Sequence, residues 1–267
     1  MTADPLTAAL DRGAPVVVLS PHLDDAVLSC GALMAHARRR VPVTVVTVFT
    51  AGSPPPYTLS GRRCIRLAGM RDAQQLYAAR RAEDTSVLSA MGVAWQHLGL
   101  PEGLFRVKPG RGGRVRRLLP ERDHVYPTYR GHLATGRISP HDSEVLRTIT
   151  ETVIALGALA ATVGPSPPLL LAPLAVGGHV DHLLLRQAAE QSGRHAVYYS
   201  EFPYNRRHEP DAEFIRRNAL GGPVTWSAGL RDKEPWILGY RTQARAMFPT
   251  GRIPLRPELY LCTGDPP

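Results

Sequence analysis

The sequence predicts an α/β fold, a Rossmann-like, doubly wound, mostly parallel sheet with helices on both faces. Short apolar, β-branched runs such as "PVVVLS" (15–20) and "VPVTVVTVFT" (41–50) alternate along the chain with longer segments of helical apolar spacing. Strands that alternate with helices are typical of parallel sheets covered on both sides. The 267 residues contain no internal repeat and no clear linker, so we expect one domain over residues 1–267.

The first hundred residues predict three strands and two helices. The apolar run at 15–20 is the first strand. The helix after it ends in three arginines, which suit the negative end of the helix dipole. The second long helix is stopped by Gly92, a typical residue for a helix C-terminus. In order, we expect a strand at 15–20, a helix at 25–40, a strand at 41–50, a helix at 70–92 and a strand at 93–100.

The second half continues the alternation. Ser139, Pro140 and Asp142 supply a cap, a first-turn proline and an N-terminal acid for a helix. The apolar run "LLLA" and the aromatic run "AVYYSEF" are strand-like. We expect a helix at 139–161, a strand at 169–172, a helix at 179–193, a strand at 196–202, a helix at 231–248 and a strand at 257–262.

A basic segment at about 106–137 interrupts this alternation. It holds nine basic and two acidic residues, a net charge of +7 out of +9 for the whole chain. The basic residues are Arg106, Lys108, Arg111, Arg114, Arg116, Arg117, Arg122, Arg130 and Arg137. The segment has no strong period, so we expect a loop insertion that is either a solvated loop or a substrate-facing rim. It has no aromatic residues interleaved as a stacking platform, which argues against a nucleic-acid partner.

Composition also limits the location of the chain. No apolar stretch approaches the length of a membrane span, and the N-terminus lacks the basic and apolar regions of a signal peptide. The cysteines, Cys30, Cys64 and Cys262, are scattered and odd in number, which fits a reducing compartment. We therefore expect a cytoplasmic protein with no membrane partner.

Two polar clusters follow predicted strands. "SPHLDD" (20–25) comes after the first strand, and "GGHVDH" (177–182) comes after the strand at 169–172. Functional sites of doubly wound sheets lie outside the carboxyl ends of the strands, so both clusters fall on the expected site edge. Either cluster alone could be an ordinary polar helix start, with Asp24 or His22 as a cap. Together, in matching positions, they favour a metal site.

The residue types in the two clusters suit a catalytic metal. Two adjacent carboxylates repel each other and are costly to desolvate unless a cation neutralises them. A catalytic zinc takes three ligands from histidine and carboxylate and keeps one position open for water. A histidine and a carboxylate from the first cluster and a histidine from the second would supply them. The other carboxylate could act as a general base, and the other histidine could stabilise an oxyanion or protonate a leaving group. Asp181 could orient that second histidine. Two histidines and one carboxylate also describe the non-haem iron oxygenases, which remain an alternative at this point.

Several motifs resemble a known family, the PIG-L/LmbE-like zinc-dependent N-deacetylases. "PHLDD" is similar to its PHPDDE signature and "HVDH" to its HxDH signature, while "RRAED", "LGLPEG", "YYSEFPY" and "KEPWILGYRTQ" fall where the family has similar stretches. "PHLDDAVLS" resembles in particular the branch that deacetylates amino sugars of natural products, including glycopeptide antibiotics. Leu23 and Ala26 depart from the family pattern, at positions without a chemical role.

The resemblance implies an LmbE-like fold and a set of roles. His22, Asp25 and His182 match the ligands of one zinc ion per chain, although other divalent metals would fit as well. Asp24 matches the general base, His179 the oxyanion-stabilising or acid residue, and Asp181 its neighbour. Arg80 and Glu102 match positions that contact the sugar.

The activity implied is hydrolysis of an N-acetyl or N-acyl group from an amino sugar, on a secondary-metabolite or glycoconjugate intermediate such as those of antibiotic biosynthesis. The expected partner is a small glycoside substrate. Two alternatives stay open: a deacetylase of a thiol–sugar conjugate, as in mycothiol-type pathways, and a non-catalytic metal-containing binding module of the same fold.

Overall fold

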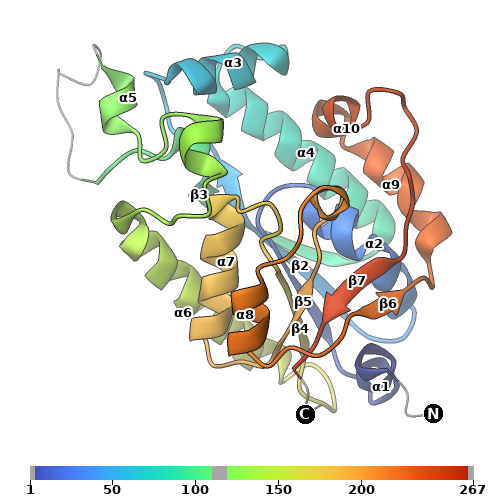
Figure 1. Ribbon diagram of the computed structural model, residues 1–267. Coiled ribbons are helices and arrows are strands. Elements are labelled where there is room, and N and C mark those ends of the chain that lie inside the picture. Colours follow the sequence, from blue (N-terminus) through green and yellow to red (C-terminus); the bar gives the residue numbers. More distant parts are fainter. Residues whose placement is uncertain (1–3, 110–118, 264–267) are drawn as a thin grey trace.

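The computed structural model describes residues 4–109 and 119–263 and contains a seven-stranded sheet with the order β3-β2-β1-β4-β5-β7-β6 (Figure 1). Strands β1 to β5 pair in parallel, and β7 runs antiparallel to both β5 and β6. The strands are β1 (Val16–Ser20), β2 (Val43–Ala51), β3 (Ala94–Pro101), β4 (Leu169–Pro173), β5 (Ala196–Tyr199), β6 (Val224–Trp226) and β7 (Glu258–Leu261). The prediction of a mostly parallel α/β sheet is confirmed.

Helices cover both faces of the sheet (Figure 1). One face packs against α1 (Pro5–Asp11), α2 (Asp25–Ala37), α4 (Ala73–Met91), α9 (Lys233–Gly239) and α10 (Arg241–Met247). The other packs against α6 (Ser143–Ala160), α7 (Val180–Gln191) and α8 (Ala212–Arg217). Successive residues of β1 serve opposite layers, because Val16 and Val18 belong to the first core and Val17 and Leu19 to the second. This explains why β1 is apolar along its whole length.

A third, smaller core lies beneath short elements beyond the carboxyl ends of the central strands. It includes Leu23, Tyr77, Phe105 and Tyr126, all buried. The elements around it are α3 (Leu59–Leu67), η1 (Gly103–Phe105), α5 (Pro120–Asp123) and η3 (Tyr129–Leu133). These elements form a layer above the edge of the sheet where parallel strands end.

The order of the strands reverses at β1. The chain passes from β1 outward to β2 and β3, and then returns to place β4 and β5 on the other side of β1. Because β1 and β4 are paired neighbours, the turns that leave them lie next to each other. Ligands of open α/β sheets bind at such a reversal, and both His/Asp clusters belong to these two turns.

The predicted segments agree with the structure at most positions and differ at two. The segment predicted as one helix at 231–248 is broken at Tyr240, between α9 and α10, and is preceded by the short turn η6 (Leu230–Asp232). The predicted helix at 139–161 begins as the turn η4 (Pro140–Asp142) before α6. Within the described residues, the helices α1, α3, α5 and α8 and the strand β6 were not predicted, and neither were the short turns η1, η3 and η5 (Tyr204–Arg206). That residues 1–267 form one domain stays a prediction.

The basic segment is more structured than the sequence predicts. Val107 and His124 form an antiparallel bridge, and α5 and η3 follow it. Arg111, Arg114, Arg116 and Arg117 lie outside the described residues. The described parts of the loop predicted at 106–137 thus contain short elements, and that the segment is an insertion stays a prediction.

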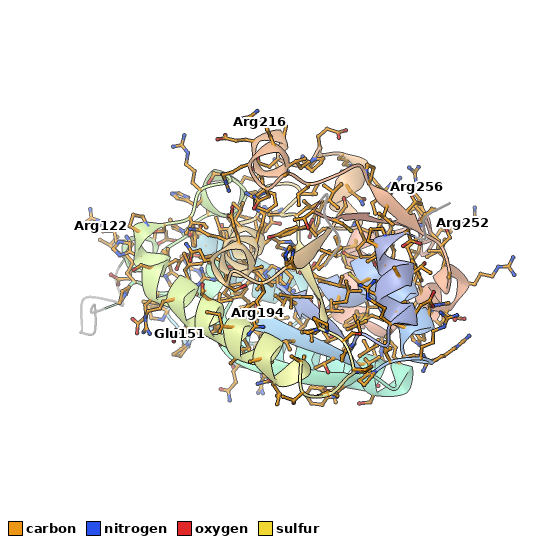
Figure 2. All side chains as sticks on the ribbon, turned by 90° about the horizontal axis from the view of Figure 1, so that it is seen from below. Arg122, Glu151, Arg194, Arg216, Arg252 and Arg256 are labelled. Carbon is orange, nitrogen blue, oxygen red and sulfur yellow. The ribbon has the colours of Figure 1, made fainter. Side chains whose placement is uncertain are left out.

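Charged side chains project outward around the periphery, as Arg122, Glu151 and Arg216 do in Figure 2. Within residues 4–109 and 119–263, no helix combines the length and the hydropathy needed to cross a bilayer.

Candidate active site

The turn after β1 is organised by Ser20. Its hydroxyl donates to the backbone oxygen of His22 at 2.7 Å and accepts the backbone N–H of Ala26 at 3.1 Å. Ser20 thereby supplies a hydrogen-bond acceptor for a backbone N–H in the first turn of α2. Asp24 stands at the N-cap position, yet its side chain makes no capping hydrogen bond. The interpretation of Asp24 as a simple helix cap is therefore wrong, and its carboxyl group lines the cavity of the site without a hydrogen bond from the described residues.

The turn after β4 is held by a buried glutamate from a different strand end. Glu201, just past β5, accepts the backbone N–H of Ala175 at 2.7 Å and of Val176 at 3.2 Å. Ala175 has a φ of 61°, the left-handed conformation that residues with a side chain rarely adopt. The strained turn delivers His179 to the N-cap of α7 and His182 to its first turn.

Three side chains from the two turns converge on one point. The Oδ2 atom of Asp25 lies 3.2 Å from Nδ1 of His22 and 3.3 Å from Nε2 of His182. In a second grouping, donor atoms of His22, His179 and His182 lie within 4.8 Å of one another. Both groupings share His22 and His182 and differ in the third donor. Imidazole and carboxylate at this spacing fit a divalent cation.

The far side of each converging histidine is held by a buried carboxylate. Nε2 of His22 lies 3.1 Å from Oδ2 of Asp181, and Nδ1 of His182 lies 3.0 Å from Oε1 of Glu201. Histidines that bind metals usually donate their other ring N–H to a carboxylate or carbonyl, which fixes the tautomer and the ring orientation. The two outer carboxylates therefore leave one nitrogen of each ring facing Asp25, as a metal would need.

The electrostatics of this cluster favour a cation. Burial alone would lower the pKa of His22, but hydrogen bonds to Asp181 and Asp25 outweigh it and raise that pKa well above its usual value. Burial would raise the pKa of Asp25, yet the neighbouring charge of His182 and the hydrogen bonds from His22 lower it to about 2. Positive charge is thus stabilised between Asp25 and the two imidazoles, which is the environment of a metal ligand set.

The pKa values of Asp24 and His179 are shifted in the directions opposite to those of Asp25 and His22, respectively. Burial, and next the charge of Asp25, raise the pKa of Asp24 well above its usual value. Burial, and next the charge of His22, lower the pKa of His179 to about 3. Nδ1 of His179 accepts the backbone N–H of Asp181 at 3.3 Å. A neutral imidazole with Nδ1 as acceptor carries its proton on Nε2, so His179 is a hydrogen-bond donor at its other nitrogen.

Asp181 has a different contact from the one the sequence predicts. Its carboxylate pairs with His22 rather than His179, which it contacts only through its backbone. The same carboxylate accepts a hydrogen bond from the backbone N–H of Gly103 at 2.8 Å and forms an ion pair with Arg106. A side chain at position 103 would come within 3.1 Å of Asp181 and 2.6 Å of Leu133, which explains the glycine. The prediction that Asp181 orients His179 is corrected: its carboxylate orients His22.

Arg106 also departs from its predicted role in a basic rim. It is buried, and its guanidinium bridges Asp181 and Asp142, the latter at 2.8 Å. Tyr126 donates its hydroxyl to the same Asp142 at 2.7 Å. Arg106 is therefore part of the support beneath His22, and not a solvent-facing cation.

A cavity of about 840 Å³ opens above the cluster. His22, Asp24, Asp25, Arg80, Glu102 and His179 line it, whereas Asp181 and His182 lie behind its wall. Arg80 pairs with Glu102 at 3.4 Å, and Tyr77 donates to the same carboxylate. Tyr129 and Tyr204 also line the cavity, with their rings 5.8 Å from the His179 ring and 6.1 Å from the His182 ring, respectively. Six of the eight predicted site residues thus meet at one cavity, and the remaining two support it.

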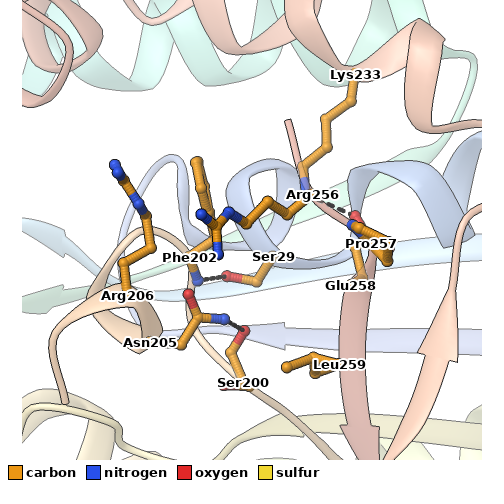
Figure 3. Close-up of a pocket in the computed structure, with 10 residues that line it drawn as sticks. All are labelled: Ser29, Ser200, Phe202, Asn205, Arg206, Lys233, Arg256, Pro257, Glu258 and Leu259. Atoms are coloured by element: carbon orange, nitrogen blue, oxygen red, sulfur yellow. Dashed lines mark hydrogen bonds and ion pairs between the residues drawn. The ribbon is translucent and has the colours of Figure 1, made fainter. Parts of the chain in front are cut away.

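A second cavity, of about 80 Å³, lies beside Ser29 and Phe202 (Figure 3). Its floor is an ion pair of 2.8 Å between Lys233 and Glu258, both buried. Glu258 also accepts the N–H groups of Ala32 and Leu33. These contacts join α9 and β7 to α2, so this cavity belongs to the packing of the core.

Four residues of the site were not predicted as such: Arg106, Tyr129, Glu201 and Tyr204. Glu201 alone carries a usable signal, because it is an acidic residue at the end of the strand-like run "AVYYSEF" on the site edge. The other three lie in segments without regular periodicity, and their place follows from tertiary contacts.

The sequence of the chain is similar to those of known deacetylases. The profile of the family PIG-L, described as GlcNAc-PI de-N-acetylase, matches residues 17–192, a range that includes both His/Asp turns. A 2'-N-acetylparomamine deacetylase of Streptomyces fradiae is 30% identical over 222 residues, covering 81% of this chain and 67% of the relative.

Two solved structures share the fold. The teicoplanin complex of a deacetylase from teicoplanin biosynthesis has a TM-score of 0.73 and 23% identity, covering 93% of this chain and 98% of the other. The zinc-inhibited form of teicoplanin deacetylase has a TM-score of 0.70 and 22% identity, covering 93% and 97% of the two chains. With both His/Asp turns inside the matched range, the chain belongs to the PIG-L family of metal-dependent N-deacetylases.

Proposed function

We propose that this enzyme removes the N-acetyl group from an amino sugar on an antibiotic intermediate. The observation that carries the proposal is the convergence of Asp25, His22 and His182. The Asp24 carboxyl group, which makes no hydrogen bond within the described part of the chain, lines the cavity beside them. The similar proteins named above act on acetylated paromamine and on teicoplanin-type compounds, both of which carry amino sugars. A cavity of about 840 Å³ has room for a sugar with part of its aglycone.

We assign the metal to His22, Asp25 and His182 and expect zinc, with other divalent cations able to replace it. When bound, the cation supplies Lewis acidity and lowers the pKa of a coordinated water. The alternative third ligand is His179. Asp25 is preferred because its Oδ2 already contacts both other donors, whereas the Nδ1 of His179 is used by the backbone of Asp181.

The residues around the metal divide the remaining work. Asp24 accepts a proton from the attacking water, whose oxygen bonds to the acetamide carbon. Nε2–H of His179 donates a hydrogen bond to the oxygen that becomes negative. The C–N bond then breaks, Asp24 returns the proton to the amine nitrogen, and acetate and the free amino sugar leave. The low pKa of His179 favours the oxyanion role over the acid role.

Arg80 and Glu102 are placed to bind the sugar. They form an ion pair at the cavity wall, which presents a donor and an acceptor to sugar hydroxyls. Tyr129 and Tyr204 add aromatic rings to the lining of the same cavity.

A substrate panel tests the proposal. Zinc-loaded protein is incubated with N-acetylglucosamine glycosides, acetylated aminoglycoside and glycopeptide precursors, and a thiol–sugar conjugate, and acetate release is measured. Turnover of amino-sugar substrates that stops after metal chelation is the expected result. Turnover confined to the thiol–sugar conjugate would move the enzyme to that pathway. Binding of metal and sugar without any acetate would identify a non-catalytic module.

A further inference from the structure

The charged side chains that line the main cavity fall into a buried group and an exposed group. Asp24, Asp25 and Glu102 are at most 8% exposed and lie at its inner end with Arg80. Arg63 of α3 and Arg130 of η3 line the same cavity but are exposed, so they lie at its mouth. The cavity therefore has acidic groups inside and basic groups outside.

The inner charges are balanced. Glu102 is paired with Arg80, which leaves Asp24 and Asp25 with two negative charges, equal to the charge of one divalent cation. The mouth is not balanced in the same way. In the part of the chain that the structure describes, neither Arg63 nor Arg130 forms an ion pair, and no carboxylate other than the inner three lines the cavity. A charge of +2 at the mouth is left without a protein counterion.

We propose that Arg63 and Arg130 select substrates that carry an anionic group, a carboxylate or phosphate, on the aglycone side of the acetylated sugar. The inference rests on the proposed function, because it takes the acetamido group to bind at the inner end. Guanidinium groups bind both anions with good geometry. An aminoglycoside, which carries several ammonium groups, would be repelled at this mouth. The chain would therefore differ in substrate charge from the acetylparomamine deacetylase that it resembles.

Three matched substrates test the proposal. They are aryl glycosides of N-acetylglucosamine whose aryl groups carry a carboxylate, a carboxamide or an amidinium, which are similar in shape and differ in charge. We expect KM to rise from the carboxylate to the carboxamide to the amidinium, by about two- to tenfold a step, as one or two exposed ion pairs allow. The value of kcat should stay similar, because the aglycone charge is remote from the amide. About 0.5 M salt should reduce the differences by screening.

Two double variants identify the residues responsible. Arg63→Gln with Arg130→Gln should bring the three KM values together and leave the carboxamide unchanged. Arg66→Gln with Arg137→Gln is the matched control, since both arginines are exposed, belong to the same two regions and do not line the cavity. It should keep the order of the three substrates.

The possible results separate this proposal from the proposed function. An unchanged order in the Arg63/Arg130 variant, or a preference for the amidinium, would overturn the charge proposal while deacetylation stands. If no glycoside is hydrolysed, the proposed function fails, and calorimetric binding of the same three compounds to the metal-loaded protein still reports the charge order. Equal affinities there would overturn the charge proposal as well.

Discussion

Asp24 and Asp25 are neighbours in sequence with opposite surroundings. Asp25 contacts two imidazoles, whereas the Asp24 carboxylate makes no capping bond and faces the cavity. We predict that Asp24→Asn keeps about one metal ion per chain and loses most activity, because the amide has nearly the same shape and cannot accept the proton of water. Metal analysis and acetate release on the same sample measure both quantities. Loss of the metal in this variant would mean that the roles of the two aspartates are exchanged.

The ligand assignment has its own test at His182. This residue is buried between Asp25 and Glu201. We expect His182→Ala to lose the metal and the activity together, since one of three ligands is removed. Full metal content after this change would contradict the assignment.

Glu201 is the residue that joins the second turn to the ligand set. One carboxylate holds the backbone of Ala175 and Val176 and the ring of His182. We expect Glu201→Gln to weaken metal affinity by about 10- to 100-fold, the usual effect of losing a carboxylate behind a histidine ligand. Competition with a chelator measures the affinity without turnover. Glu213→Gln, an exposed change on α8, is the matched control, and equal affinities in the two variants would exclude a positioning role for Glu201.

At the scale of elements, Arg106 connects three pieces of the structure. Its guanidinium pairs with Asp181 of α7 and Asp142 of η4, both fully buried, while Arg106 follows η1. We expect Arg106→Met to lower the free energy of unfolding by about 3–5 kcal/mol, since it leaves two buried carboxylates without their cation. Urea unfolding measures the change. Arg122→Met, an exposed change in the same segment, should have little effect, and similar stability of the two variants would contradict this role.

The Arg106 network also predicts a pH dependence. Burial acts to raise the pKa of Asp181, but the charge of Arg106 and the hydrogen bond from His22 outweigh it and hold that pKa well below its usual range. A carboxyl whose pKa is lower in the folded state stabilises the protein above the pKa of the unfolded chain, about 4. That stabilisation is lost as the pH falls below about 4. We expect the acid side of the stability–pH curve to be steeper in the wild type than in Arg106→Met, and equal slopes would contradict the assignment.

Local signals explain which elements could be predicted. Gly92 ends α4 with a φ of 68°, and Ser139 caps the turn before α6, so both boundaries were readable from single residues. The helix break at Tyr240 could not be predicted from neighbouring residues. The Tyr240 hydroxyl donates to Asp84 at 2.7 Å, and Thr242 bonds to Glu83, so the junction of α9 and α10 is set by α4, far away in sequence.

The same distinction holds for the site. The histidines and aspartates were predictable because each cluster is a short turn after an apolar strand. Arg106 was not, since its two carboxylate partners lie 36 and 75 residues away in sequence. Glu201 stands at the end of a strand-like run on the site edge, but its sequence position does not show that it pairs with His182, 19 residues away. The carboxylate contact of Asp181 was assigned to the wrong histidine for a related reason. Sequence shows that Asp181 adjoins His179 and His182, but only the fold shows that it reaches His22 across the boundary between β1 and β4.

At the scale of the whole molecule, most of the net charge of +9 is in one segment whose described parts have two separate roles. Arg106 is buried beneath the ligand set, and Arg130 lies at the mouth of the cavity. Arg111, Arg114, Arg116 and Arg117 belong to the same segment and lie outside the described residues, and positive charge on a protein attracts substrates of the opposite sign. We expect the excess charge to act on anionic substrates in two ways, by contact at Arg130 and by attraction at a distance.

Neutralising Arg111, Arg114, Arg116 and Arg117 separates the long-range attraction from the contact at Arg130. We expect the combined change of Arg111, Arg114, Arg116 and Arg117 to Gln, which lowers the formal net charge by four, to raise KM for the carboxylate glycoside and to leave the carboxamide unchanged. The effect should be smaller than that of the Arg63/Arg130 variant and should vanish in about 0.5 M salt, because salt screens the long-range attraction between charges. An equal rise for all three glycosides would indicate damage to folding. An unchanged KM for the carboxylate glycoside would show that the basic segment acts only through Arg130.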